Sequence, residues 1–276
     1  MFRALSPHKH CASSYYFHSN MNPPKPLTIL TGASRGMGLA MARELLVHGG
    51  TLLCIARQTS HELELLARAH GTELIQWKYD LALPAPVAEA LHAWLAWQPP
   101  QAFATATLIN NAGVIPPLVP LEQARTQDTT HALRVGLEAP MVLTSAFLAA
   151  TASWSAQRRV LNISSGLGRR AMASQSAYCA AKAGLDHFTR CLALDQAHSA
   201  NPARVCSLAP GVIDTDMQVQ LRQGDPAAFP DQGNFAGLHA NGHLSSPDEA
   251  ARRVLQYLAR ADFGANPVAD VRDAAR

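Results

Sequence analysis

The sequence predicts a doubly wound α/β domain, with a parallel sheet of six to seven strands and helices on both faces. The chain of 276 residues suits one large domain whose core needs no disulfide or metal to hold it together. Short runs rich in β-forming residues alternate with longer stretches of helical pattern. Strands separated by helices are joined by right-handed crossovers and pair in parallel. The predicted strands span residues 27–31, 51–56, 73–77, 105–109, 159–163 and 204–208.

Local signals place the ends of the first two helices. The sequence His48-Gly49-Gly50 predicts the end of the first helix, because glycine readily adopts the left-handed conformation that closes a helix. Thr59 and Glu62 have the spacing of a capping box, in which each side chain bonds a backbone N–H of the other residue. We therefore predict that the second helix follows Thr59 and ends at Gly71.

The last helix has an equally clear start. Ser246 supplies an N-cap and Pro247 a first helical position, so a helix is predicted from here through about Arg260. The preceding residues 218–244 are rich in Gly, Pro and Asn and show little periodicity. A connection this long within a compact domain usually forms a lid or a binding loop. We predict a lid-like loop at about residues 216–245, with a passive surface insertion as the alternative.

Two predicted helices are long and apolar on more than one face. One runs from about residue 121 to 152, and the other from Tyr178 through His198. Burial inside the protomer is one explanation of their composition, and association between protomers is another. We expect a homodimer or homotetramer.

Residues 1–26 differ from the rest of the chain. They hold Ser, His and Pro in place of periodic hydrophobic residues, and the first acidic residue of the chain is Glu44. They lack the apolar core of a signal peptide. We expect a flexible extension, or a start upstream of a more natural one at Met21, before a single domain at 27–276. An organellar transit peptide is the alternative, since Arg3, Lys9 and several serines occur without an acid.

The composition excludes several classes of protein. Hydrophobic residues make up 48% and charged residues 16%, unlike a disordered chain. A net charge of +3 without a dense basic run does not indicate nucleic-acid binding, and no run reaches the about 18 apolar residues of a membrane span. The five cysteines lack metal or disulfide spacing and indicate a reducing compartment, so we expect a cytoplasmic protein without a metal. The clustered residues His8, His10, Cys11 and His18 also lack the spacing of a metal site.

The strongest chemical signals follow the predicted strands, where ligands of open parallel sheets bind. A glycine-rich turn follows the first strand and opens a helix. Its glycines permit a tight turn and a close approach of the backbone to a pyrophosphate, which then lies at the positive end of the helix. The turn reads Thr31-Gly32-Ala33-Ser34-Arg35-Gly36-Met37-Gly38.

The residue after the second strand bears on cofactor choice. Arg57 stands where an NAD-binding unit usually carries an acid for the ribose 2′-hydroxyl. Arg57 and Arg35 can clamp a 2′-phosphate with charge-assisted hydrogen bonds, so NADP(H) is favoured over NAD(H). A solvated surface arginine is the alternative reading of Arg57.

The remaining strands also end in polar or glycine-bearing turns. Asp80 follows the third strand, where its carboxylate can accept from an adenine amino group. The turns after the fourth, fifth and sixth strands are Asn110-Asn111-Ala112-Gly113, Ser164-Ser165-Gly166 and Pro210-Gly211-Val212. All six predicted strands therefore deliver such a turn to one edge of the sheet.

The catalytic signal lies in the helix after the fifth strand. Tyr178 and Lys182 are four residues apart, which places both side chains on one helix face. A free phenol has a pKa of about 10 and is a poor acid or base near neutrality. A neighbouring ammonium stabilises phenolate, and lowering the pKa by about 3 units takes roughly 4 kcal/mol, which is reachable in a partly dry cleft.

Taken together, these motifs resemble the short-chain dehydrogenase/reductase family over about residues 27–272. The chain looks nearest to the sepiapterin reductase and benzil reductase branch. The resemblance implies a Rossmann-type fold and assigns roles by position: Ser165 holds the substrate carbonyl, Tyr178 donates the proton, and Lys182 holds the nicotinamide ribose hydroxyls. Thr215 is implied to contact the cofactor carboxamide. The residues implied to bind the cofactor are Gly32, Ser34, Arg35, Gly36, Met37, Gly38, Arg57, Asp80, Leu81, Asn110, Ala112, Gly113, Tyr178, Lys182, Pro210, Gly211, Ile213 and Thr215.

One departure from the family pattern concerns the proton relay. Many members place an Asn in the helix after the NNAG turn, where it holds a water behind the lysine, and that position here is Gly136. The loss puts the relay in doubt and leaves hydride transfer untouched. A water can occupy the vacated space where polar partners remain.

The predicted function is an NADPH-dependent carbonyl reductase. Hydride passes from the nicotinamide to a ketone, diketone or pterin-like carbonyl while Tyr178 protonates the oxygen. The alternative, motivated by Gly136, is an NADP(H)-binding sensor or scaffold with little turnover. A Rossmann-fold methyltransferase has no use for the tyrosine–lysine pair, and the G-x-S-x-G elbow of a hydrolase is missing from the sequence. The expected partner besides the cofactor is a small carbonyl or alcohol substrate.

Overall fold

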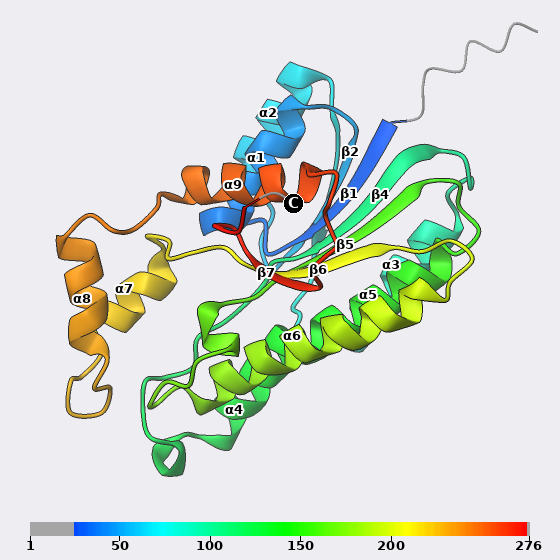
Figure 1. The fold of residues 1–276 in the computed structure, drawn as a ribbon. Helices are drawn as coiled ribbons and strands as arrows, with labels where there is room; N and C mark the ends of the chain where they lie inside the picture. Colours follow the sequence, from blue (N-terminus) through cyan, green and yellow to red (C-terminus); the bar gives the residue numbers. More distant parts are fainter. Residues whose placement is uncertain (1–24, 275–276) are drawn as a thin grey trace, which may run out of the picture.

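The computed structural model describes residues 25–274, and these form a seven-stranded sheet (Figure 1). Every pair of neighbouring strands is parallel, in the order β3-β2-β1-β4-β5-β6-β7. The chain builds outward from β1 to β3 and then returns to the other side of β1. Open sheets bind ligands at such a switch point, here between β1 and β4. The strands are β1 (Lys25–Thr31), β2 (Thr51–Ala56), β3 (Glu73–Lys78), β4 (Phe103–Asn110), β5 (Gln157–Ile163), β6 (Arg204–Ala209) and β7 (Val268–Asp270).

Helices cover both faces of the sheet (Figure 1). Three of them, α1, α2 and α9, pack on one face, while α3, α5 and α6 pack on the other. Helices α7 and α8 extend beyond the carboxyl ends of the strands. The helices are α1 (Gly36–Val47), α2 (His61–His70), α3 (Pro84–Ala96), α4 (Thr126–Leu133), α5 (Ala139–Ala150), α6 (Ser176–Ala197), α7 (Asp216–Arg222), α8 (Gln232–Ala240) and α9 (Pro247–Ala259).

Alternate residues of a strand face opposite core layers. In β1, Leu27 and Ile29 pack in the layer of α3 and α5, while Leu30 packs in the layer of α1 and α9. All three side chains are fully buried. Each such burial stabilises the fold by about 1.5–3 kcal/mol relative to exposure, so the central strand is anchored on both faces. Its carboxyl end, which carries the glycine-rich turn, is therefore held firmly in place.

The predicted fold class and all six predicted strands are confirmed. The structure adds β7, a strand of three residues that is too short to produce a periodic signal of its own. The first strand begins at Lys25, so the last two residues of the predicted extension belong to the sheet. The predictions made for Met21 and for the histidines before it lie outside the described residues.

The predicted capping box of α2 is wrong by one residue. Ser60, and not Thr59, is the N-cap, and its Oγ accepts a hydrogen bond of 3.4 Å from the backbone N–H three residues further on. Glu62 does not return to the cap but binds the guanidinium of Arg43 on α1. The tertiary ion pair between the two helices therefore replaces the local hydrogen bond that the sequence suggested.

Other predicted helix ends are confirmed. His48 is the C-cap of α1, and Gly71 closes α2 in the left-handed conformation. The Oγ of Ser246 accepts a hydrogen bond of 3.1 Å from the N–H of Glu249 at the start of α9. Helix α6 ends one residue before the predicted limit at His198.

The predicted lid-like loop is not irregular throughout, because it contains α7 and α8. A small apolar cluster stabilises this segment: Leu221 and Phe229 are buried in it, and Phe235 stacks on Phe229 with ring centroids 5.8 Å apart. These residues pack on Leu118 and Met172, which lie far away in the sequence. The glycines and prolines of the segment hide its helical pattern, while tertiary contacts supply the stability.

The predicted long helix near residues 121–152 is interrupted. A 3₁₀ turn, η1 (Leu121–Gln123), precedes α4, and a π-helical turn, η2 (Arg134–Glu138), joins α4 to α5. The run Thr126–Ala150 is long and apolar enough to cross a membrane by length and composition alone. Half of its most apolar window is buried in the fold against α3 and α6, and the core helix of a soluble protein has the same properties.

Candidate active site

A cleft of about 630 Å³ lies at the carboxyl ends of the strands, beneath α7. Small-molecule and cofactor sites have volumes of about 300–1,000 Å³. Every residue predicted for catalysis or cofactor binding borders this cleft, with the exception of Asn110. Turns from Gly32 to Thr215, which lie far apart in the sequence, therefore meet at one site, as the strand pattern predicted.

The glycine-rich turn forms a cradle that side chains would fill. A Cβ on Gly38 would lie 2.1 Å from the carbonyl oxygen of Gly32, so only glycine fits at the start of α1. Gly32 and Gly36 both have positive φ angles, of 73° and 54°. The N-cap residue Arg35 makes no side-chain capping bond, and the first turn of α1 carries no acid. The leading N–H groups of the helix are thus directed at the cleft without a side-chain cap, which fits the pyrophosphate of a dinucleotide.

The cradle is tied to β4 by a residue to which we assigned no role. Asn111 donates hydrogen bonds from Nδ2 to the carbonyl oxygens of Thr31, at 3.0 Å, and Gly32, at 3.4 Å. The Oγ1 of Thr31 in turn accepts from the N–H groups of Asn111 and Ala112. These bonds span the switch point between β1 and β4. The NNAG motif points to Asn111 in the sequence, but the sequence does not show that Asn111 bonds to Thr31 and Gly32.

The structure does not bring Asn110 to the cleft. Its side chain is 3% exposed and donates to Thr144 Oγ1 at 3.1 Å and to Asn162 Oδ1 at 2.8 Å, inside the sheet and helix layers. The side chain of Asn110 therefore does not reach the cleft, and the predicted role of this residue in cofactor binding stays a prediction. Successive residues of a strand end point to opposite sides, so of the two adjacent asparagines Asn111 borders the cleft and Asn110 points to the core.

The far end of the cleft holds the residues predicted for the adenosine half of the cofactor. Arg57 is exposed at the end of β2, and Asp80 follows β3 with one carboxylate oxygen accepting from the N–H of Ala82 at 2.9 Å. Arg35 does not stand alone, since its Nη1 forms an ion pair of 3.0 Å with Asp216 on α7. The two side chains are 64% and 78% exposed, so this pair contributes only about 0–1 kcal/mol.

The three predicted catalytic residues lie together in the cleft wall. Ser165 follows β5 and caps a 3₁₀ turn, η3 (Gly166–Gly168), with its Oγ accepting from the N–H of Leu167 at 3.2 Å. Tyr178 and Lys182 lie one turn apart on α6 and are both buried. The Tyr178 hydroxyl is 4.0 Å from the sulfur of Met217 on α7, so α7 covers the reacting group.

Burial sets the protonation of the pair. It raises the pKa of Tyr178 to about 12, against a smaller opposite effect of a hydrogen bond with Ser165. Burial also lowers the pKa of Lys182 to about 8, and the negative charge of Asp186 opposes this. Burial therefore determines the direction of the Tyr178 pKa shift in this structure, and the expectation that Lys182 lowers this pKa stays a prediction. The Lys182 ammonium lies 5.7 Å from the Tyr178 ring centroid and donates to the carbonyl oxygen of Ile163 at 2.7 Å.

A buried carboxylate supports this wall from behind. Asp186 is 1% exposed, and its Oδ1 accepts from Ser164 Oγ at 2.6 Å and Ser207 Oγ at 2.7 Å. Its Oδ2 accepts from Arg169 Nε at 3.2 Å. Asp186 thus joins β5, β6, η3 and α6 directly beside Ser165. We did not predict this residue, although its position four residues after Lys182, on the same helix face, was a usable signal.

Gly136 lies beside the catalytic helix, as the family pattern implied. It belongs to the π-helical turn η2, and a Cβ built on it would be 3.1 Å from the Cβ of Ala181, the residue before Lys182. One turn further along α6, a Cβ on Gly184 would lie 2.8 Å from a methyl carbon of Leu137. The two segments are packed through small residues, and π-helical turns of this kind are frequent at functional sites.

The substrate end of the cleft was not predictable from motifs. It is bordered by residues of the β4–α4 connection, of η3, and of α7 and α8, which are mostly apolar. They include Val114, Ile115, Leu167, Met217, Gln218, Leu221 and Phe235. Arg170 borders the same region. None of these residues belongs to a recognisable motif, since they come together only when α7 packs over the sheet edge.

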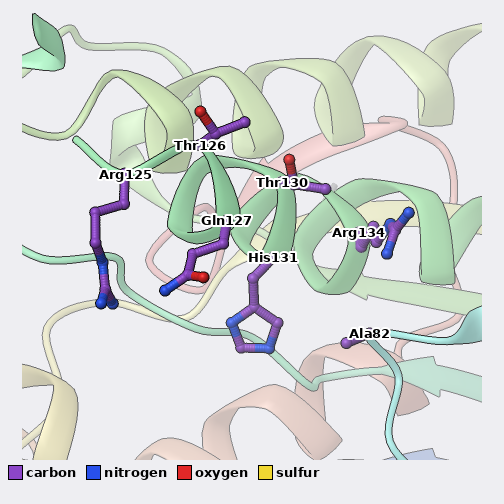
Figure 2. Close-up of a pocket in the computed structure, with 7 residues that line it drawn as sticks. All are labelled: Ala82, Arg125, Thr126, Gln127, Thr130, His131 and Arg134. Carbon is purple, nitrogen blue, oxygen red and sulfur yellow. The ribbon is translucent and has the colours of Figure 1, made fainter.

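A second, shallower hollow adjoins the cleft at His131, which borders both (Figure 2). Arg125, the residue before α4, and Gln127 and His131 of α4 project to the same side of the helix, and Ala82 also lines the hollow. Arg125 is held by Asp128 at 2.7 Å, and Arg134 lies 3.9 Å from Glu138. Since both cations have acidic neighbours and the hollow is open to solvent, we assign it no role in catalysis.

Fold and site together define a class of enzyme. A parallel sheet with a glycine-lined, uncapped helix N-terminus at its switch point binds a nicotinamide dinucleotide, and a buried tyrosine and lysine beside a serine supply acid–base chemistry. This is a nicotinamide-dependent oxidoreductase. The family model described as short chain dehydrogenase matches residues 27–226. The chain belongs to the short-chain dehydrogenase/reductase family.

Known relatives agree with this assignment. The chain is 34% identical to benzil reductase ((S)-benzoin forming) of Bacillus cereus over 235 residues, which are 85% of this chain and 94% of that one. It is 30% identical to sepiapterin reductase of Meriones unguiculatus over 257 residues, 89% of this chain and 95% of that one. Among solved structures, a metagenomic short-chain oxidoreductase in complex with NADP is similar with a TM-score of 0.66 and 26% identity, covering 90% of this chain and 96% of that chain. The predicted family and branch are confirmed.

Proposed function

We propose that the protein is an NADPH-dependent carbonyl reductase that acts on ketones or diketones with apolar flanks. The observation that carries the proposal is the Tyr178 hydroxyl, which is buried beside Ser165 in the wall of a cleft with a dinucleotide cradle at its other end. The relatives named benzil reductase and sepiapterin reductase reduce carbonyl compounds by name, which supports carbonyl reduction by this chain.

The residues of the site have distinct tasks in this reaction. A bound NADPH supplies the hydride. Ser165 donates a hydrogen bond to the substrate carbonyl oxygen, and Tyr178 transfers the proton from its hydroxyl to that oxygen. A pKa of about 12 keeps the Tyr178 phenol protonated at neutral pH, which is the form a proton donor needs. Lys182 holds a positive charge close to the developing phenolate as the proton leaves, and it is positioned to hold the ribose hydroxyls.

The preference for NADPH is proposed from the adenosine end of the cleft. Arg35 and Arg57 border this end, and both side chains are exposed to the solvent from which a 2′-phosphate arrives. The Arg35–Asp216 pair is weak enough for a phosphate to compete with it, because an exposed ion pair contributes at most about 1 kcal/mol. A bidentate arginine–phosphate contact is about twice as strong as a neutral hydrogen bond.

The assembly and the compartment are also proposals. The apolar side chains of Met141 on α5 and Leu194 on α6 are 41% and 70% exposed, which supports association through these helices into a homodimer or homotetramer. We place the enzyme in the cytoplasm, as its cysteine usage predicts. Its partner besides the cofactor is a small carbonyl or alcohol substrate.

The test is a reductase assay that crosses NADPH and NADH with a panel of ketones and α-diketones, including benzil and sepiapterin. We expect loss of cofactor absorbance with NADPH, at least 10-fold faster at low cofactor concentration than with NADH, which corresponds to roughly 1.4 kcal/mol. Tyr178→Phe should abolish turnover while cofactor affinity stays within about threefold. Retained activity in that variant contradicts the mechanism. Tight cofactor binding without turnover on any carbonyl would favour the sensor alternative.

A further inference from the structure

Arg170 is a charged residue at the cleft that the proposed reaction does not use. It follows η3, and its backbone N–H donates to the carbonyl oxygen of Gly166 at 3.0 Å. It therefore lies about one helical turn beyond Ser165, which holds the substrate carbonyl in the proposed function. Arg170 borders the cleft and is exposed, so a molecule in the cleft can reach it.

The charge of Arg170 acts on the substrate end of the cleft. Burial raises the pKa of the Cys179 thiol, and the positive charge of Arg170 is one of the effects that oppose this rise. Cys179 packs on the apolar cluster beneath α7, and so does Leu167, which borders the cleft. The guanidinium thus lies close to the apolar side chains that surround a substrate.

No acid among the residues that the structure describes neutralises Arg170. Its guanidinium forms neither an ion pair nor a hydrogen bond with residues 25–274. Asp214, Asp216 and Asp270 border the cleft, but each is paired with another arginine. Asp80 lies at the adenosine end, after β3. The substrate end of the cleft therefore carries a positive charge without a counterion from this part of the chain.

The preceding arginine has a different task. Arg169 donates from Nε to Asp186 Oδ2 at 3.2 Å and from Nη2 to the carbonyl oxygen of Ala269 at 2.8 Å. These bonds join η3 to α6 and β7, so the fold itself accounts for Arg169. The contacts of the fold do not account for Arg170 in the same way, and its guanidinium is free to bind a ligand.

The chemistry of a single guanidinium indicates which anion fits. Its planar fork matches a carboxylate with two parallel N–H···O bonds. A phosphate monoester carries a charge of about −1.5 to −2 and calls for a second cation, whereas Arg57 lies at the other end of the cleft and Lys182 serves Tyr178. One carboxylate is balanced by Arg170 alone.

The position of Arg170 sets how far this carboxylate lies from the reacting carbonyl. A helical turn rises about 1.5–2 Å per residue, so the five residues from Ser165 to Arg170 span roughly 8–10 Å. The carboxylate and the carbonyl are therefore separated by several bonds. The side chains between them are mostly apolar, which fits an apolar spacer.

We infer that Arg170 is a specificity-determining residue that binds a carboxylate at the far end of the substrate. The preferred substrates are keto acids in which an aromatic ring or a methylene chain separates the carboxylate from the reacting ketone. This inference rests on the proposed carbonyl reductase function and specifies its substrate class. Because Arg170 lies a turn away from the residues that hold the reacting carbonyl, it contributes to substrate binding, and its loss affects KM more than kcat.

Two matched pairs of compounds test the inference: 4-acetylbenzoate and 6-oxoheptanoate, each with its methyl ester. Within a pair the ketone and the spacer are the same, and only the charge differs. The experiment measures kcat and KM at saturating NADPH for the wild type, Arg170→Gln and Arg68→Gln. Arg68 on α2 serves as the control, because it is exposed, forms no ion pair with the described residues and does not border the cleft.

We expect the wild type to favour at least one acid over its ester by fivefold or more in kcat/KM. Arg170→Gln should lower kcat/KM for that acid about 10-fold, equivalent to roughly 1.4 kcal/mol, mainly through KM, and change the ester less than about twofold. Comparing the two fold-changes removes any difference in intrinsic reactivity between acid and ester. Arg68→Gln removes the same charge from another surface and should leave all values within about twofold of the wild type.

Two further variants separate recognition of the carboxylate from a change in the fold. Arg170→Lys keeps the charge but not the planar fork, so it should recover part of the preference for the acid. Arg170→Glu should reduce the acid still more slowly than Arg170→Gln while sparing the ester. All three variants should unfold at the temperature of the wild type, because the guanidinium has no partner among the described residues.

The outcomes distinguish the inference from the proposed function. Equal fold-changes for acid and ester in Arg170→Gln, or a wild type that reduces carbonyls of the panel without favouring either acid over its ester, would overturn the inference and leave the reductase function standing. A wild type that binds NADPH and reduces no carbonyl at all overturns the proposed function and the inference with it.

Discussion

Removal of the buried carboxylate of Asp186 should cost more stability than any single change in the cleft itself. The carboxylate joins two hydroxyls, Ser164 Oγ at 2.6 Å and Ser207 Oγ at 2.7 Å, and the guanidinium of Arg169 at 3.2 Å. Asp186→Ala leaves both hydroxyls without their acceptor, and Ser164 and Ser207 are 3% and 0% exposed. Water therefore cannot replace the lost bonds without a change in packing.

The magnitude follows from the number and kind of these bonds. A hydrogen bond to a charged group contributes about 1.5–3 kcal/mol, and breaking a buried charge pair from one side costs about 3–5 kcal/mol. We expect Asp186→Ala to lower the free energy of unfolding by about 3–5 kcal/mol. Asp186→Asn keeps one carbonyl oxygen for the two hydroxyls but loses the negative charge and the acceptor for Arg169, so its cost should be smaller, at about 1–2 kcal/mol.

Denaturant unfolding of the purified variants measures these costs, with Asp195→Ala as the control. Asp195 is an exposed residue of the same helix, so its substitution should change the free energy of unfolding by less than about 0.5 kcal/mol. The pH profile of carbonyl reduction gives a second readout. Because Asp186 raises the pKa of Lys182 against the effect of burial, Asp186→Asn should move the alkaline decline of the rate to lower pH. Equal costs for the Ala and Asn variants, or an unmoved profile, would refute this account of Asp186.

Three further outcomes follow from the site. Gly38→Ala should weaken cofactor affinity by 10-fold or more in a fluorescence titration, because its Cβ would lie 2.1 Å from the carbonyl oxygen of Gly32. The control Gly233→Ala, whose Cβ would meet open space, should leave the affinity unchanged. Gly136→Asn should destabilise the fold by about 1–3 kcal/mol without raising the reductase rate, because its Cβ would lie 3.1 Å from the Cβ of Ala181. The double variant with Ala181→Gly should recover stability in thermal unfolding. Failure of the double variant to do so would contradict close packing as the cause. The rate of carbonyl reduction should decline as the pH rises through about 8, where Lys182 loses its charge. The rate of alcohol oxidation should rise with pH, because Tyr178, with a pKa of about 12, must first lose its proton. Parallel pH profiles for the two directions would contradict these assignments.

The scaffold and one side of the site follow from the amino-acid sequence alone. The strand–helix alternation predicts the parallel sheet, and the turns after successive strands must meet at one edge for topological reasons. Gly38 and the Tyr178–Lys182 pair were therefore identifiable, because their chemistry depends on residue type and short-range spacing alone. Residue type and short-range spacing do not depend on how distant segments of the chain pack.

The features that depend on contacts between distant segments became visible in the tertiary structure. It assigned the cap of α2 to Ser60, directed Asn110 into the core, and turned the glycine-rich segment before α9 into two helices over the cleft. It also set the direction of the Tyr178 pKa shift through burial, since a neighbouring lysine is visible in the sequence but the depth of burial is not. Hydrogen-bond partners, burial and local electrostatics are set by which surfaces pack together, and short-range spacing contains no information about that packing.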